Sequence, residues 1–152
     1  MTIYKSKGFT IIELLVVVAI IAVLAAIVLV NVTGYINQGK NAAIKGNLAT
    51  VLTNGAVFYE AGGTYANFCT NAYVTGPSAA VLAAGGSALT TAVNGCVVNA
   101  ANTTWCACST MKVTTAEPAN STFCVDSTGY KKVTQNAGLC ANRCPVGGAC
   151  AD

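Results

Sequence analysis

The cysteines are the residues in this sequence best suited to covalent chemistry. All eight lie after residue 68, at Cys69, Cys96, Cys106, Cys108, Cys124, Cys140, Cys144 and Cys150. An even number of cysteines, confined to the part of a chain beyond a hydrophobic segment, is typical of disulfide bonds formed in an oxidising compartment. Eight cysteines allow roughly a hundred connectivities, so the pairing stays open. Cys106 and Cys108 are expected on the same face of a strand, with different partners.

A metal site is the alternative use of these thiols. Structural zinc usually takes two closely spaced pairs of ligands, and Cys140-x3-Cys144 fits one such pair. Cys106-x-Cys108 does not fit the second. The compartment and the spacing therefore favour disulfides, and we predict neither a bound metal nor a cofactor.

Catalytic groups are sparse in the sequence. The chain has no histidine, which excludes Ser-His-Asp and Cys-His nucleophiles. The carboxylates after the hydrophobic segment are scattered and suggest no acid/base pair: Glu60, Glu117, Asp126 and Asp152. We therefore do not expect an enzyme.

One carboxylate, Glu13, stands at an unusual place. It is followed by seventeen residues, Leu14–Val30, without a polar side chain. A carboxylate at the centre of a bilayer costs roughly 2.5–3.5 kcal/mol, and less near the interface. Either Glu13 is solvated among lipid headgroups or it awaits a positive partner. The charge alone does not separate these two interpretations.

The hydrophobic segment itself is long enough to cross a membrane. As a helix of about 1.5 Å per residue, Phe9–Val32 would exceed a hydrocarbon core of roughly 30 Å. Lys5 and Lys7 precede it and should stay on the cytoplasmic side, so the rest of the chain is exported. The small residue Gly8 comes before the apolar run, whereas a secretory signal has its cleavage site after the run.

The residues Lys7-Gly8-Phe9-Thr10-Ile11-Ile12-Glu13-Leu14-Leu15 and the apolar run that follows resemble the N-terminal motif of type IV pilins and pseudopilins. The resemblance implies cleavage by a prepilin peptidase between Gly8 and Phe9, and N-methylation of Phe9. It also implies that Glu13 of one subunit pairs with the new amine of a neighbour, so that each charge offsets the cost of burying the other. Many pilins have a proline where this chain has Val30.

The resemblance and the residue pattern together predict an α+β, pilin-like fold. A long N-terminal helix packs on a small antiparallel sheet with disulfide-stapled loops. We expect a leader at 1–8, a hydrophobic transmembrane and assembly helix at 9–32, an amphipathic half of the helix at 33–60, and an exported globular head at 61–152. Apolar residues near every third or fourth position form one face of the amphipathic half, with polar residues such as Asn41 elsewhere.

Strands are expected towards the C-terminus of the head. They are predicted at Thr103–Thr115, Thr122–Asp126 and Tyr130–Thr134, the last two joined by the turn Asp126–Gly129. For residues 61–102 the sequence predicts a loop with a short helix around Ala79–Ala84. For residues 135–152 it predicts a disulfide-stapled loop over the sheet.

These features predict a structural subunit of a type IV pilus-like filament. The expected partners are further copies of the chain, a prepilin peptidase and an assembly platform in the membrane. The subunit is expected in the inner membrane before assembly and in an extracellular pilus afterwards. A pseudopilin of a type II secretion system, or a minor pilin with an adhesin or DNA-uptake role, shares the same motif and stays open. Residues after the leader are near neutral, so nucleic acid is not an expected partner.

Overall fold

The computed structural model describes residues 8–89, 95–135, 140–145 and 147–151. The predicted leader therefore lies outside the described residues except for Gly8, as does Asp152. The chain divides into two compact units, Met1–Tyr35 and Ile36–Asp152.

Helix α1 (Ile11–Gly62) supplies the first unit and the first element of the second. From Ile11 to Val32 it contains no glycine or proline, the residues that most weaken a helix. It ends at Gly62, and the next residue, Gly63, has φ 68° and donates its N–H to the Tyr59 carbonyl at 2.6 Å. A glycine in the left-handed region is the usual C-terminal cap of a helix.

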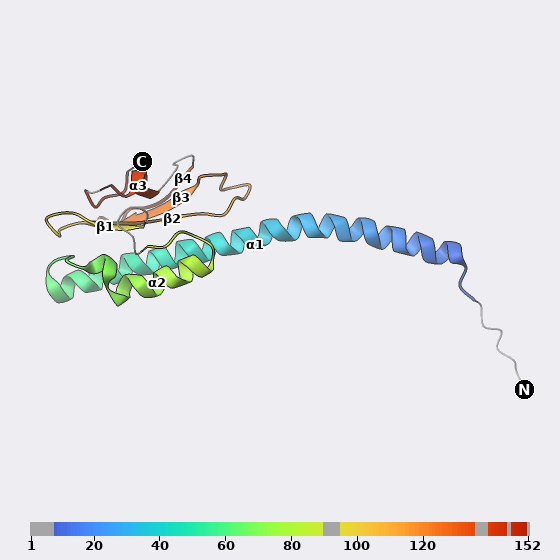
Figure 1. The fold of residues 1–152 in the computed structure, drawn as a ribbon, viewed down its shortest axis with the longest axis horizontal. Coiled ribbons are helices and arrows are strands. Elements are labelled where there is room, and N and C mark those ends of the chain that lie inside the picture. Colours follow the sequence, from blue (N-terminus) through green and yellow to red (C-terminus); the bar gives the residue numbers. More distant parts are fainter. Residues whose placement is uncertain (1–7, 90–94, 136–139, 146, 152) are drawn as a thin grey trace, which may run out of the picture. The chain divides into compact units, whose positions relative to one another are not determined.

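The second unit has three layers (Figure 1). The C-terminal half of α1 and helix α2 (Ala72–Ala83) cover one face of a four-stranded antiparallel sheet. The short helix α3 (Cys140–Arg143) lies on the opposite face. The strands follow the order of the sequence and are β1 (Cys96–Val98), β2 (Trp105–Thr110), β3 (Thr122–Asp126) and β4 (Lys131–Thr134). The predicted α+β fold, with its long helix, small sheet and disulfides, is confirmed.

The hairpin between β3 and β4 is built around Asp126. Its Oδ1 accepts hydrogen bonds from the Thr128 N–H at 2.9 Å and the Thr128 hydroxyl at 2.6 Å. Gly129 has φ 90°, a backbone conformation that residues with a side chain rarely adopt. An aspartate that bonds to the backbone two residues on is a common turn former, which explains why the turn was predictable.

The main core lies between the sheet and its two helices. Ile44, Leu48 and Val51 of α1 are fully buried there, together with Trp105 of β2. An ideal Cβ on Gly55 would lie 2.5 Å from Cζ2 of Trp105. Gly55 therefore leaves the space on α1 that the indole ring occupies.

Residues 61–102 contain more structure than predicted. The helix lies at Ala72–Ala83 rather than around Ala79–Ala84, and it includes Pro77. Asn71 starts it by accepting the Tyr73 N–H at 3.2 Å. A 3-10 turn (η1, Phe68–Thr70) and strand β1 also lie in this region, where the sequence predicted only loop.

Candidate functional site

The first turn of α1 is closed by a reciprocal pair of hydrogen bonds. The Thr10 hydroxyl accepts the Glu13 N–H at 3.2 Å, and Oε2 of Glu13 accepts the Thr10 N–H at 2.9 Å. The Thr10 hydroxyl also donates to the same carboxylate oxygen at 2.8 Å. This arrangement is a capping box, in which two backbone donors without helical partners are satisfied.

The sequence analysis missed this role of Glu13, although the signal was present. Thr10-x-x-Glu13 directly before an apolar run is the sequence signature of a capping box. A negative charge in the first turn also interacts favourably with the helix dipole. Glu13 is thus held at the helix start by its own chain, with the rest of its carboxylate available to a partner.

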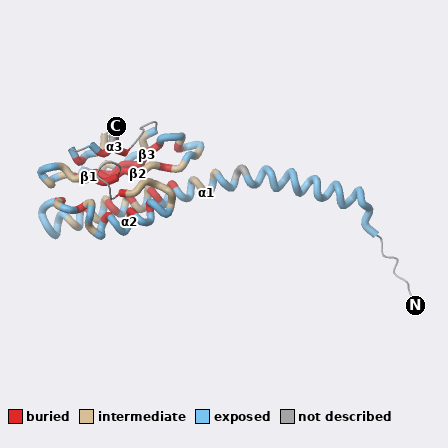
Figure 2. The backbone as a smooth tube through the Cα atoms, in the orientation of Figure 1, coloured by how far each residue is buried: buried red, intermediate tan, exposed pale blue. Residues whose placement is uncertain are grey.

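The surface of α1 that follows Glu13 along the chain is almost entirely apolar. Large hydrophobic side chains from Phe9 to Val32 are exposed, with Phe9 at 81 % and Ile11 at 84 % (Figure 2). By length and composition α1 is able to cross a membrane. Exposed apolar surface on this scale is typical of a segment that contacts lipid or partner chains. α1 is also continuous past Val30, where many pilins have proline.

A polar cluster fastens the loop between β2 and β3 to α1 in the second unit. The side-chain amide of Asn41 donates to the Lys112 carbonyl at 2.8 Å and accepts the Lys112 N–H at 2.7 Å. Nζ of Lys45 lies 2.6 Å from Oε1 of Glu117. From the sequence Asn41 was expected off the buried face, which was wrong because Asn41 is buried. Glu117, for which the sequence suggested no acid/base partner, is buried as well.

The electrostatics of Glu117 follow from these contacts. The hydrogen bond from Lys45, and after it the bond from the Thr114 hydroxyl, hold the pKa of the Glu117 carboxyl below its ordinary value. Burial acts in the opposite direction. Because its donors and its countercharge are all in place, this carboxylate stays ionised and serves to position the loop.

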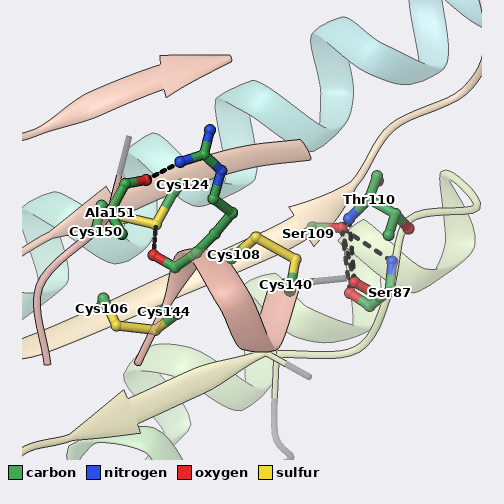
Figure 3. The surroundings of a disulfide bond; sticks show 11 residues. Ser87, Cys106, Cys108, Ser109, Thr110, Cys124, Cys140, Cys144, Cys150 and Ala151 are labelled. Atoms are coloured by element: carbon green, nitrogen blue, oxygen red, sulfur yellow. Dashed lines mark hydrogen bonds between the residues drawn. A yellow bond between two sulfur atoms is a disulfide. The ribbon is translucent and has the colours of Figure 1, made fainter. Parts of the chain in front are cut away.

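All eight cysteines form disulfide bonds. Cys69–Cys96 joins the turn after α1 to β1, on the helix side of the sheet. Three further bonds tie the C-terminal segment to the other face of the sheet: Cys106–Cys144, Cys108–Cys140 and Cys124–Cys150 (Figure 3). Cys106 and Cys108 share a face and have different partners, as predicted. The sulfurs of Cys140 and Cys144 are bonded, so they do not form half of a zinc site.

These three bonds form a second core of their own. Their buried sulfurs pack together with the side chains of Val97 and Tyr130. Asp126 extends this core by accepting the Cys150 N–H at 2.8 Å. At the other end of β2, Thr110 donates its N–H to the Ser87 hydroxyl at 3.1 Å, which fastens the loop after α2 (Figure 3).

The long helix, the small antiparallel sheet and the stapled C-terminal segment define a pilin-like α+β protein. A family model described as the prokaryotic N-terminal methylation motif matches residues 3–29. The type IV major pilin protein PilA of Myxococcus xanthus (strain DK1622) is 38 % identical over 64 residues, which are 42 % of this chain and 29 % of that protein. Over the matched residues the chain is therefore similar to type IV pilins.

The likeness to PilA is partial. The matched part spans less than a third of the length of that relative. No solved structure matches the chain significantly.

Proposed function

We propose that this protein is the structural subunit of a type IV pilus-like filament and has no enzymatic activity. The observation that carries the proposal is the first unit: an exposed apolar helix in which Glu13 is the single charged side chain among the described residues up to Tyr35. Such a helix resides in lipid before assembly and packs against other helices afterwards. The major pilin among its relatives favours this role over that of a pseudopilin or minor pilin.

Processing at the N-terminus is the second part of the proposal. A prepilin peptidase cuts between Gly8 and Phe9, and Phe9 is then N-methylated. The methylation motif that matches residues 3–29 supports this step. The mature amine lies close to Thr10 and Glu13 in sequence, where α1 starts, so the site of modification and the site of assembly coincide.

Glu13 then specifies the register between subunits. Its carboxylate takes the positive terminus of a neighbouring Phe9 as its partner, since a buried charge is tolerated when it is paired. Partners in the membrane are the peptidase and an assembly platform, and the final location is the cell surface.

The N-terminal peptide of the protein in sheared surface fibres tests this proposal. A peptide that starts at Phe9 and carries one methyl group is expected by mass spectrometry. Assembled material that retains Met1 would refute the processing, and cells that export the protein without making fibres of it would refute the role as major subunit.

Two matched variants separate capping from assembly. Glu13→Gln keeps an N3 side chain able to complete the capping box but removes the charge. Thr10→Val keeps the charge and removes the cap. We expect fibre yield to fall by at least tenfold in Glu13→Gln and to change little in Thr10→Val. A tenfold fall in the assembly equilibrium corresponds to a loss of about 1.4 kcal/mol of interaction between subunits. The reverse order would show that Glu13 acts only as a cap.

A further inference from the structure

Cys108 and Cys124 face each other across the sheet, although neither is bonded to the other. They are directly paired in the register between β2 and β3. The Cys108 N–H points to the opposite side and donates to the Gly95 carbonyl at 2.7 Å. Cys108 and Cys124 are therefore a non-hydrogen-bonded pair, whose Cα atoms are about 4.5 Å apart in an antiparallel sheet. That separation is within the range that a disulfide accepts, roughly 4.4–6.8 Å.

The native partners of both cysteines come from the end of the chain. Cys108 bonds to Cys140 at a sequence separation of 32, and Cys124 bonds to Cys150 at a separation of 26. Cys108 and Cys124 are only about half as far apart in sequence as Cys108 and Cys140. Loop-closure entropy then favours their encounter by roughly threefold. They are also exported before either native partner if the chain crosses the membrane from its N-terminus.

The face of the sheet that carries these sulfurs is covered by the C-terminal segment. Cys108 and Cys124 are buried at 0 % and 2 % exposure once Cys140, Cys144 and Cys150 are bonded over them. Before that segment docks, the other residues packed against this cluster are the partly buried Val97 and Tyr130, so an oxidant is able to reach the two thiols. After docking, the same sulfurs are closed to exchange.

We infer that Cys108 and Cys124 first form a cross-strand disulfide, and that Cys140 is the resolving cysteine that converts it to the native pairing. In the first step two electrons and two protons pass from the two thiols to a disulfide-type oxidant, which becomes a dithiol. The Cys140 thiolate then attacks Sγ of Cys108. The Cys108–Cys140 bond forms, the Cys108–Cys124 bond breaks, and the proton lost by Cys140 returns to Cys124.

The Cys124–Cys150 bond closes after this exchange. Cys124 and Cys150 are oxidised by a second equivalent of the same oxidant, again with loss of two electrons and two protons. The Asp126 carboxylate holds the Cys150 N–H and so brings this cysteine to β3. The partner implied is an exported thiol–disulfide oxidant that acts on the uncovered sheet face.

Refolding of the full chain in detergent micelles tests the order of the bonds. The C106S/C144S protein leaves Cys108 as the single cysteine on β2, so its cross-links are unambiguous. The reduced protein is refolded in a glutathione redox buffer, quenched with an alkylating agent, and mapped by mass spectrometry. The Cys108–Cys124 cross-link should exceed the Cys108–Cys140 cross-link about threefold at the earliest times and then disappear. Absence of that cross-link at every time would overturn the inference.

One double variant of the otherwise native chain tests the geometry at equilibrium. C140S/C150S removes both native partners, and its folded form should contain no free thiol because Cys108 bonds to Cys124. Two free thiols in folded C140S/C150S would show that the register does not direct the bond. If this variant does not fold, the refolding experiment still decides.

Discussion

Trp105 packs against Gly55 of α1, and this contact predicts opposite changes in stability when Gly55 and Gly46 of the same helix are replaced by alanine. Gly55 is buried, and an ideal Cβ there would lie 2.5 Å from Cζ2 and 2.8 Å from Nε1 of Trp105. Gly46 lies nine positions earlier on the same helix, is exposed, and has no atom within 4 Å of its ideal Cβ. The variants Gly55→Ala and Gly46→Ala make the same chemical change in the two environments.

The magnitudes follow from two opposing terms. Replacing glycine by alanine inside a helix gains about 1 kcal/mol from helix propensity in both variants. Gly55→Ala additionally forces the indole ring to move, and overpacking of this kind costs about 1–3 kcal/mol. Trp105 has little room to yield, because Phe68 and Tyr65 lie against it at ring-centroid distances of 4.8 and 6.3 Å. We therefore expect Gly46→Ala to be stabilised and Gly55→Ala to be destabilised.

Thermal unfolding with the disulfides intact measures the difference. At roughly 4 °C per kcal/mol, the Tm of Gly46→Ala should rise by about 4 °C and that of Gly55→Ala should fall below the Tm of the parent protein. Trp105 is the single tryptophan, so its fluorescence reports directly on the contact. Equal increases in Tm for the two variants would refute the assignment of Gly55 as the position that leaves space for Trp105.

Three further predictions concern the polar cluster and the covalent links of the head. Asn41→Leu leaves the Lys112 backbone groups without their side-chain partner, so it should lower the free energy of unfolding by about 1–3 kcal/mol in denaturant titrations. The control is Asn47→Leu, because the Asn47 amide donates to the Ala43 carbonyl of the same helix. An equal loss of stability in the two variants would contradict the role of Asn41. The pKa of Glu117 is lowered on folding, so its stabilising contribution is present above the unfolded value of 4.5 and is lost as the pH falls through the lower folded value. The free energy of unfolding should therefore depend less on pH below 4.5 in Glu117→Gln than in the parent protein, and equal slopes would exclude an ionised Glu117. The double variant C69S/C96S should lose about 2–5 kcal/mol of stability in the same titrations, and an unchanged midpoint would show that this link is dispensable.

The parts of the fold that could be predicted from the sequence are those with local signals. β3 was predicted at its exact bounds because alternating strand residues run directly into the Asp126–Gly129 turn. The long helix α1 followed from an uninterrupted apolar run and the amphipathic pattern after it. In contrast, α2 and β1 lie in a region rich in alanine, glycine and asparagine, where no hydrophobic period marks an element.

The residues that were misjudged depend on contacts between distant segments. Asn41 is polar at a buried helix position, and only the backbone of Lys112, 71 residues away, makes that placement favourable. Glu117 gains its role from Lys45, which is equally remote. The disulfide pairing is of the same kind, because it depends on the register of β2 and β3 and on the path of the C-terminal segment.

The three disulfide bonds on the sheet face opposite α1 and α2 also determine which fragments a protease is able to release. Every peptide bond between Cys106 and Cys150 is bridged by at least one of these disulfides, so a single cut there leaves both fragments attached. The Cys69–Cys96 bond protects the segment before β1 in the same way. The connection from Cys96 to Cys106 has no such bridge. It is instead a turn in which Oδ1 of Asn99 accepts the N–H groups of Thr103 and Thr104, so this unbridged stretch between β1 and β2 is held together by its own hydrogen bonds.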